Sequence, residues 1–256
     1  MQRFVLVIQY KGTNFSGSQT QQKRKDFETD LEGGVRTVQG ELEKAIRTLT
    51  KERIKTVFSG RTDAGVHARE QFVHLDSEFN FEREGIIGSL NGLLPKDISV
   101  SRIFRVGNDF HVQRSAKSRF YRYKIVNRLQ RSAFDEDCLY VRKPLNIDYI
   151  NRVLGFLAGE HDFTSFKKTN TENPAKICRV SDVRCHREGD EVYIDITADR
   201  FLYGMVRAIV GTVLYMERKG LPEAQIAAIL EAKDRREAGP AVSPFGLTLM
   251  KVNYTQ

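Results

Sequence analysis

The sequence predicts an α+β fold made of two ferredoxin-like repeats that share a mainly antiparallel central sheet. In the first half, strand-like alternation and helix-like periodicity follow each other in the order strand, helix, strand, strand, helix, strand. The second half repeats this order more loosely, and 256 residues are enough for two small domains. We place the repeats at residues 1–106 and 107–256. Helices should cover one face of the sheet and leave a basic cleft on the other.

In the first repeat, Thr37 should cap a helix, because apolar residues then recur at helical spacing. A second helix should end before Pro95. The expected strands are alternating or β-branched segments at residues 4–10, 54–58, 71–75 and 98–103. The polar segment 19–34 predicts a mobile loop.

In the second repeat, residues 119–126 form an aromatic, strongly strand-like run. Further strands are expected at residues 177–185, 192–198 and 245–252, and the first two should form a hairpin. Helical periodicity predicts helices at residues 147–157, 201–216 and 222–232.

Composition favours a soluble protein that binds a polyanion. Lys and Arg number 41 against 33 Asp and Glu, a formal net charge of +8, which suits nucleic acid although it also serves solubility. No apolar run approaches the ~20 residues of a membrane span. The first residues, MQRFVLVIQYKG, lack the features of a signal peptide. We therefore expect a cytoplasmic protein without a membrane segment.

The three cysteines cannot all pair with one another, and reduced thiols are the default in the cytoplasm. Cys178, Cys185 and His186 offer half of a zinc site, whereas structural zinc usually shows two close ligand pairs. The sequence therefore predicts no metal; Cys138 is the remaining thiol.

The strongest functional signal is a polar turn within residues 58–76, FSGRTDAGVHAREQFVHLD. Glycines on either side of Arg61, Thr62 and Asp63 let the backbone bend sharply or approach a ligand closely. Sites are often built on such loops, which a rigid scaffold holds in place. The alternative is an aspartate that caps its own backbone beside a solvated arginine.

Two residues of the second half are further candidates. Tyr121 lies in a strand with interleaved arginines and could stack a nucleobase, or it could belong to the core with Tyr123. Arg207 stands in an otherwise apolar helix, FLYGMVRAIVGTVLYM, with glycines one turn away on each side. A buried arginine needs an acid, and Asp63 is the natural partner, unless the side chain extends from the helix edge to solvent.

The run RTDAGVHA at residues 61–68, followed by a Q-x-V-H strand, resembles the catalytic motif of the tRNA pseudouridine synthase A family. The R-x-Y-x-Y strand and the F-L-x-x-M-V-R-x-I-V-G helix are similar to that family as well, and weaker matches extend over nearly the whole chain. The resemblance implies that Asp63 is the catalytic residue, that Tyr121 lines the uridine pocket and that Arg207 pairs with Asp63.

The chain departs from the family pattern in three places. Ser18 stands in Gly-Ser-Gln where the family usually has G-W-Q. The segment 21–34 is longer than usual, and residues 111–114 read HVQR where the family tends to have H-A-R-F. These departures concern how the protein grips RNA outside the pocket.

The resemblance implies a homodimer that converts uridine to pseudouridine at positions 38, 39 and 40 in the anticodon arm of tRNA. Asp63 would start the reaction, Arg207 would keep it ionised, and Tyr121 would stack on the uracil. Arg61 and Thr62 would contribute to substrate binding. The reaction consumes nothing, so no cofactor is expected.

The alternative from another class is a non-catalytic RNA-binding protein with two RRM-like repeats, because RNA-recognition modules have the same element order. The chain lacks their K/R-G-F/Y-G/A-F-V octamer, and RTDAGVHA has no purpose in such a protein. A ferredoxin-like enzyme for a small molecule would not use the positive charge.

Overall fold

The computed structural model describes residues 1–20, 35–168 and 176–255, and the expected mobile segment falls largely outside them. The chain forms two compact units. Unit 1 consists of Met1–Lys117 and Leu249–Gln256, and unit 2 of Ser118–Thr248. Both combine helices with mostly antiparallel strands, which confirms the predicted α+β class. The expected ferredoxin-like repeats at residues 1–106 and 107–256 stay a prediction.

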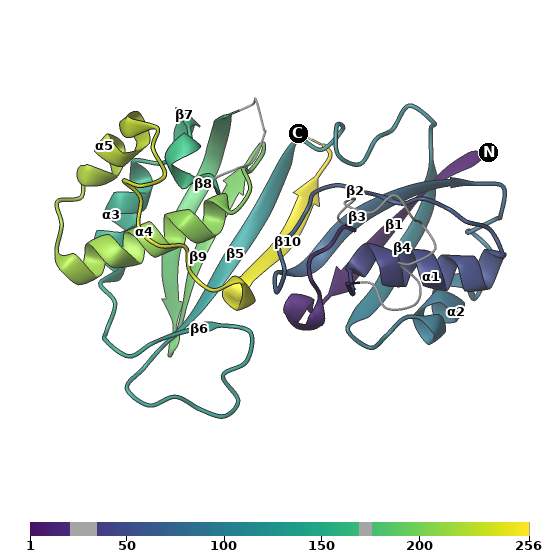
Figure 1. Ribbon diagram of the computed structural model, residues 1–256, viewed down its shortest axis with the longest axis horizontal. Helices are drawn as coiled ribbons and strands as arrows, with labels where there is room; N and C mark the ends of the chain where they lie inside the picture. The colour runs from purple at the N-terminus through teal and green to yellow at the C-terminus, as the bar shows by residue number, and fades with distance from the viewer. Residues whose placement is uncertain (21–34, 169–175, 256) are drawn as a thin grey trace. The chain divides into compact units, whose positions relative to one another are not determined.

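Unit 1 contains its elements in the predicted order. They are β1 (Gln2–Tyr10), α1 (Val38–Thr50), β2 (Val57–Phe58), β3 (His67–Ser77), α2 (Ile86–Leu93) and β4 (Ile98–Val106). β1 lies between β4 and β3 and is antiparallel to both, while β2 pairs with β3. α1 and α2 lie against each other on one face of this sheet (Figure 1). β2 is shorter than expected, and β3 starts earlier, at His67.

The predicted helix cap in unit 1 is confirmed. The hydroxyl of Thr37 accepts a hydrogen bond from the Gly40 amide at 3.1 Å, which satisfies one of the donors that a helix start leaves open. Val38, Leu42 and Ile46 of α1 are fully buried. Each such side chain contributes about 1.5–3 kcal/mol of burial, so the cap and the apolar stripe together fix α1 on the sheet.

Unit 2 begins with β5 (Ser118–Asn127), which pairs with β9 (Glu191–Ala198). β9 forms the predicted hairpin with β8 (Ile177–Glu188), whose other edge carries β7 (Gly159–Asp162). The short β6 (Leu139–Val141) runs parallel to β5. The sequence does not predict β6 or β7.

The helices of unit 2 are α3 (Ile147–Gly155), α4 (Met205–Lys219) and α5 (Gln225–Ala232), and α3 packs against β8 and α4. α4 starts later than residue 201 because Gly204 adopts a left-handed conformation, φ 74°, at its N-terminus. β10 (Leu247–Asn253) ends the chain's regular structure, and only its residues from Leu249 onward belong to unit 1. No helix in the described part of the chain is long and apolar enough to span a membrane.

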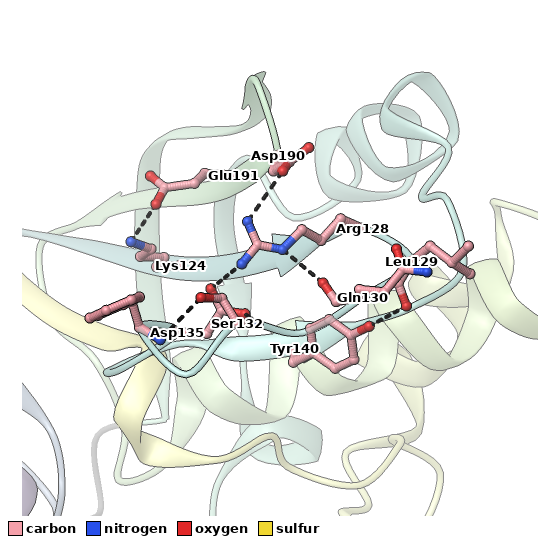
Figure 2. Close-up of polar contacts among 10 residues, drawn as sticks. Lys124, Arg128, Leu129, Gln130, Ser132, Asp135, Tyr140, Asp190 and Glu191 are labelled. Atoms are coloured by element: carbon pink, nitrogen blue, oxygen red, sulfur yellow. Dashed lines mark hydrogen bonds and ion pairs between the residues drawn. The ribbon is translucent and has the colours of Figure 1, made fainter.

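One arginine organises the loop between β5 and β6 (Figure 2). The guanidinium of Arg128 pairs with Asp135 at 2.5 Å and with Asp190, in the β8–β9 turn, at 3.2 Å. Its Nε donates to the Gln130 carbonyl at 2.9 Å. The loop is thereby tied to the neighbouring hairpin, although its Phe134 side chain is exposed.

Candidate active site

The predicted catalytic turn connects β2 to β3 in unit 1. The Ser59 amide donates to Phe72 O at 2.8 Å, and the Val66 amide donates to Asp63 O at 3.2 Å, so both ends of the turn are tied down. Gly65 has φ 81°, a left-handed conformation that favours glycine. Asp63 is half-buried.

The loop after β1 packs against this turn through close contacts between the two backbones. A Cβ at Gly12 would lie 2.0 Å from the carbonyl oxygen of Val66, so only glycine fits there. A Cβ at Gly17 would lie 3.1 Å from the carbonyl oxygen of Thr62. The Gly65 amide donates to Phe15 O at 3.3 Å. The glycines of the loop therefore let two backbone segments touch.

Ser18 both donates a hydrogen bond to the turn and accepts one from it. Its amide donates to the Thr62 carbonyl at 3.1 Å, and its hydroxyl accepts from the Thr62 amide at 2.9 Å. Ser18 is completely buried. Ser18 thus fixes the backbone beside Asp63, and the bond to the Thr62 amide depends on the acceptor of its side chain.

The side chain of Thr62 is buried in unit 1. Its hydroxyl is 2.9 Å from the Tyr10 hydroxyl, and only 3% of the residue is exposed. Burial raises the pKa of Tyr10, so this phenol stays protonated. The predicted role of Thr62 in substrate binding stays a prediction, whereas its neighbour Arg61 is exposed, as a phosphate ligand must be.

Arg207 lies in α4 of unit 2 and is half-buried. Its Nε donates to Val242 O at 2.9 Å, and the Val242 amide donates back to Arg207 O at 3.2 Å. The backbone approaches closely at the neighbouring glycine, because a Cβ at Gly211 would lie 1.8 Å from Pro240 O. The helix and the segment before β10 thus hold this arginine in place.

The two tyrosines of β5 are both buried. The ring of Tyr121 is 8% exposed and meets the ring of Phe201 edge-on, with centroids 4.9 Å apart. Tyr123 donates its hydroxyl hydrogen to Ser243 O at 2.8 Å, and burial raises its pKa despite the charge of Arg207. Tyr123 is therefore a core residue, while a role of Tyr121 in the uridine pocket stays a prediction.

The interleaved arginines of β5 have partners within unit 2. Arg122 forms a two-pronged ion pair with Asp195 of β9, at 2.7 and 2.8 Å, and Asp195 is 1% exposed. Arg119 donates to Asp199 O at 2.6 Å. Arg122 therefore contributes to the fold of unit 2 through this ion pair.

The two cysteines of β8 are buried in unit 2. Burial raises the pKa of both Cys178 and Cys185 to about 12. Within residues 1–20, 35–168 and 176–255, no three His, Cys, Asp or Glu side chains are arranged to hold a metal ion.

Comparison with known proteins assigns the fold and the turn to one family. The family model described as tRNA pseudouridine synthase matches residues 6–113 and 156–255, which include the turn, Tyr10, Ser18 and α4. The chain belongs to the tRNA pseudouridine synthase family. Enzymes of this family are isomerases that act on tRNA. The chain is therefore an isomerase of this class, and the alternative of a non-catalytic RNA-binding protein is not needed.

Two curated relatives named tRNA pseudouridine synthase A illustrate the similarity. The protein from Halalkalibacterium halodurans is 38% identical over 100% of this chain and 94% of its own length. The protein from Geobacillus kaustophilus is 39% identical over 99% and 95%. A chain of a crystal structure titled Cbf5-Nop10-Gar1 complex aligns with 98% of this chain and 58% of its own, at 10% identity and a TM-score of 0.40.

Proposed function

We propose that this protein isomerises uridine to pseudouridine at positions 38, 39 and 40 in the anticodon arm of tRNA, with Asp63 as the essential residue. The N1–C1′ glycosidic bond breaks and a C5–C1′ bond forms. The C5 hydrogen leaves as a proton, and N1 gains one. The balance is complete without a cofactor.

The observation that supports this proposal is the anchoring of the Asp63 turn. The residue before Asp63 is held through its amide and its carbonyl by Ser18, and the residues after it pack on Gly12 and Phe15. A carboxylate on such a turn has a fixed place relative to a bound base. Preorganised groups of this kind lower a barrier without reorganising during the reaction.

Substrate binding draws on three features. Arg61 is exposed directly beside Asp63, and the net charge of +8 attracts the tRNA backbone. Tyr121 supplies an aromatic face for the flipped uracil, since a base removed from its stack needs a replacement contact.

Arg207 is the cation that we expect to keep Asp63 ionised. We further propose a homodimer in the cytoplasm, in keeping with the family.

The test is release of tritium from tRNA labelled at C5 of uridine. Three anticodon-arm substrates carry one uridine each, at position 38, 39 or 40, and a control carries cytidine at all three positions and labelled uridine elsewhere. We expect release from the three substrates and none from the control. Release from the control at the same rate would contradict the proposed positions, and no release from any substrate would contradict the activity.

A further inference from the structure

A hydrogen-bond network joins the Asp63 turn to three other segments of unit 1. Its members are Tyr10 of β1, Ser18, Thr62 of the turn and Gln71 of β3, and none is more than 4% exposed. Polar groups buried this deeply are costly if any partner is lost. An apolar core would carry no such risk, so the network invites a functional explanation.

The amide of Gln71 sets the direction of the bonds. The Gly60 carbonyl can only accept, so the group 2.8 Å from it is the Gln71 Nε2 donor. The same Nε2 donates to the Tyr10 hydroxyl at 3.4 Å, the longest bond of the network. Gln71 Oε1 then accepts from Ser59 at 2.5 Å.

Tyr10 connects Gln71 to the turn. Its oxygen accepts a hydrogen bond from Gln71 Nε2. The hydroxyls of Tyr10 and Thr62 lie 2.9 Å apart and form a hydrogen bond in which either can be the donor. Thr62 is consequently held at three points, its hydroxyl by Tyr10 and its amide and carbonyl by Ser18.

We propose that Tyr10, Ser18 and Gln71 are positioning residues, which act through Thr62 to hold the carboxylate of Asp63 in its reactive place. The proposal rests on the proposed function, in which Asp63 is the reacting group. Rates are sensitive to such placement, because an error of about 1 Å can cost roughly 10²-fold. The network is buried and does not face RNA, so it affects turnover and not tRNA affinity.

The test uses substitutions that remove a single hydroxyl and keep the shape of the side chain. Tyr10→Phe and Thr62→Val each break the Tyr10–Thr62 bond, and Thr62→Ser keeps it. Thr56→Val is the matched control, because Thr56 is also buried and its hydroxyl donates to Glu43 at 2.8 Å, away from the turn. kcat and KM for tRNA are measured at a temperature at which circular dichroism shows each variant folded.

We expect kcat to fall at least about tenfold for Tyr10→Phe and Thr62→Val, with KM within about twofold of the wild type. Thr62→Ser, which keeps the hydroxyl, should lose less kcat than Thr62→Val, and Thr56→Val should keep a kcat near that of the wild type. Wild-type kcat in folded Tyr10→Phe and Thr62→Val would overturn the proposal. An equal loss in Thr56→Val would overturn it as well, because the loss would then be one of general stability.

A parallel Asp63→Asn variant separates this proposal from the proposed function. If Asp63→Asn keeps wild-type turnover, the proposed role of Asp63 fails. If Asp63→Asn is inactive while the network variants stay fully active, only the positioning role fails.

Discussion

Thr62 and Ser18 are joined by two hydrogen bonds that run in opposite directions, at 2.9 and 3.1 Å. Such a reciprocal pair fixes a backbone position and its orientation together. The pair ties Thr62, the residue before Asp63, to a loop that is 44 positions away in the sequence. The site is therefore built by tertiary contacts of unit 1 and not by the turn alone.

The close contact beneath the turn predicts a strong glycine requirement at residue 12. In Gly12→Ala the new Cβ would lie 2.0 Å from Val66 O, which forces the two backbones apart. We expect a loss of unfolding free energy of about 2–4 kcal/mol by urea denaturation, together with lower activity. Gly60→Ala is the control, because a Cβ there meets nothing within 4 Å. An equal loss in both variants would argue against the close packing.

The buried carboxylate of Asp195 predicts unequal roles for its two arginines. Arg122→Met leaves a charge that is 1% exposed without its two-pronged partner and should cost about 3–5 kcal/mol of unfolding free energy. Arg184 lies 3.6 Å from the same carboxylate but its side chain is 62% exposed, so Arg184→Met should cost less than about 1 kcal/mol. Equal costs in chemical denaturation would contradict this difference.

The buried His74 leads us to expect that the folded protein loses stability as the pH falls. It is 4% exposed, and burial, with Arg3, His111 and Arg114 nearby, lowers its pKa to about 4, although Asp76 opposes the shift. The unfolded chain takes up this proton near its ordinary pKa of 6.5. The contribution of neutral His74 to the free energy of unfolding is therefore complete above pH 6.5, and it is lost as the pH falls to about 4.

The measurement for His74 compares the wild type with His74→Asn. The stability difference between the two should shift in favour of the variant by about 2–3 kcal/mol between pH 7 and pH 4. Parallel stability curves over this range would show that His74 does not titrate in the predicted way.

The predicted pairing of Asp63 with Arg207 is tested by a double-mutant cycle. Each single change to alanine would leave one charge without its partner, while the double change would leave neither. We expect a coupling of about 0.5–3 kcal/mol in unfolding free energy. Additive effects would mean that Arg207 has another role, for which its contact with Val242 is a candidate.

Most elements of the fold are predictable from local patterns. The cap at Thr37, the end of α2 before Pro95 and the apolar run of β1 are all properties of neighbouring residues, although β1 is buried on both faces and does not alternate as expected. Leu139–Val141 and Gly159–Asp162 were too short or too polar for any periodic signal, and their strands depend on their partners β5 and β8.

The candidate site is predictable only in part, for the same reason. The glycines and charges of the turn are adjacent in sequence, so they draw attention to Asp63. The bonds from Thr62 to Tyr10 and from Gln71 to Tyr10 span 52 and 61 positions, and no local pattern marks them. The Gln71 in the middle of a strand is the one available signal, because a buried amide there needs partners.

The central claim is that the carboxylate of Asp63 carries the reaction, and Asp63→Asn tests it most directly. The change keeps the size and the hydrogen-bonding capacity of the side chain and removes its charge. The measurement is tritium release from C5-labelled tRNA under single-turnover conditions, with tRNA binding and folding checked on the same sample. The account predicts normal folding, normal binding and no tritium release. Release at the wild-type rate would contradict it.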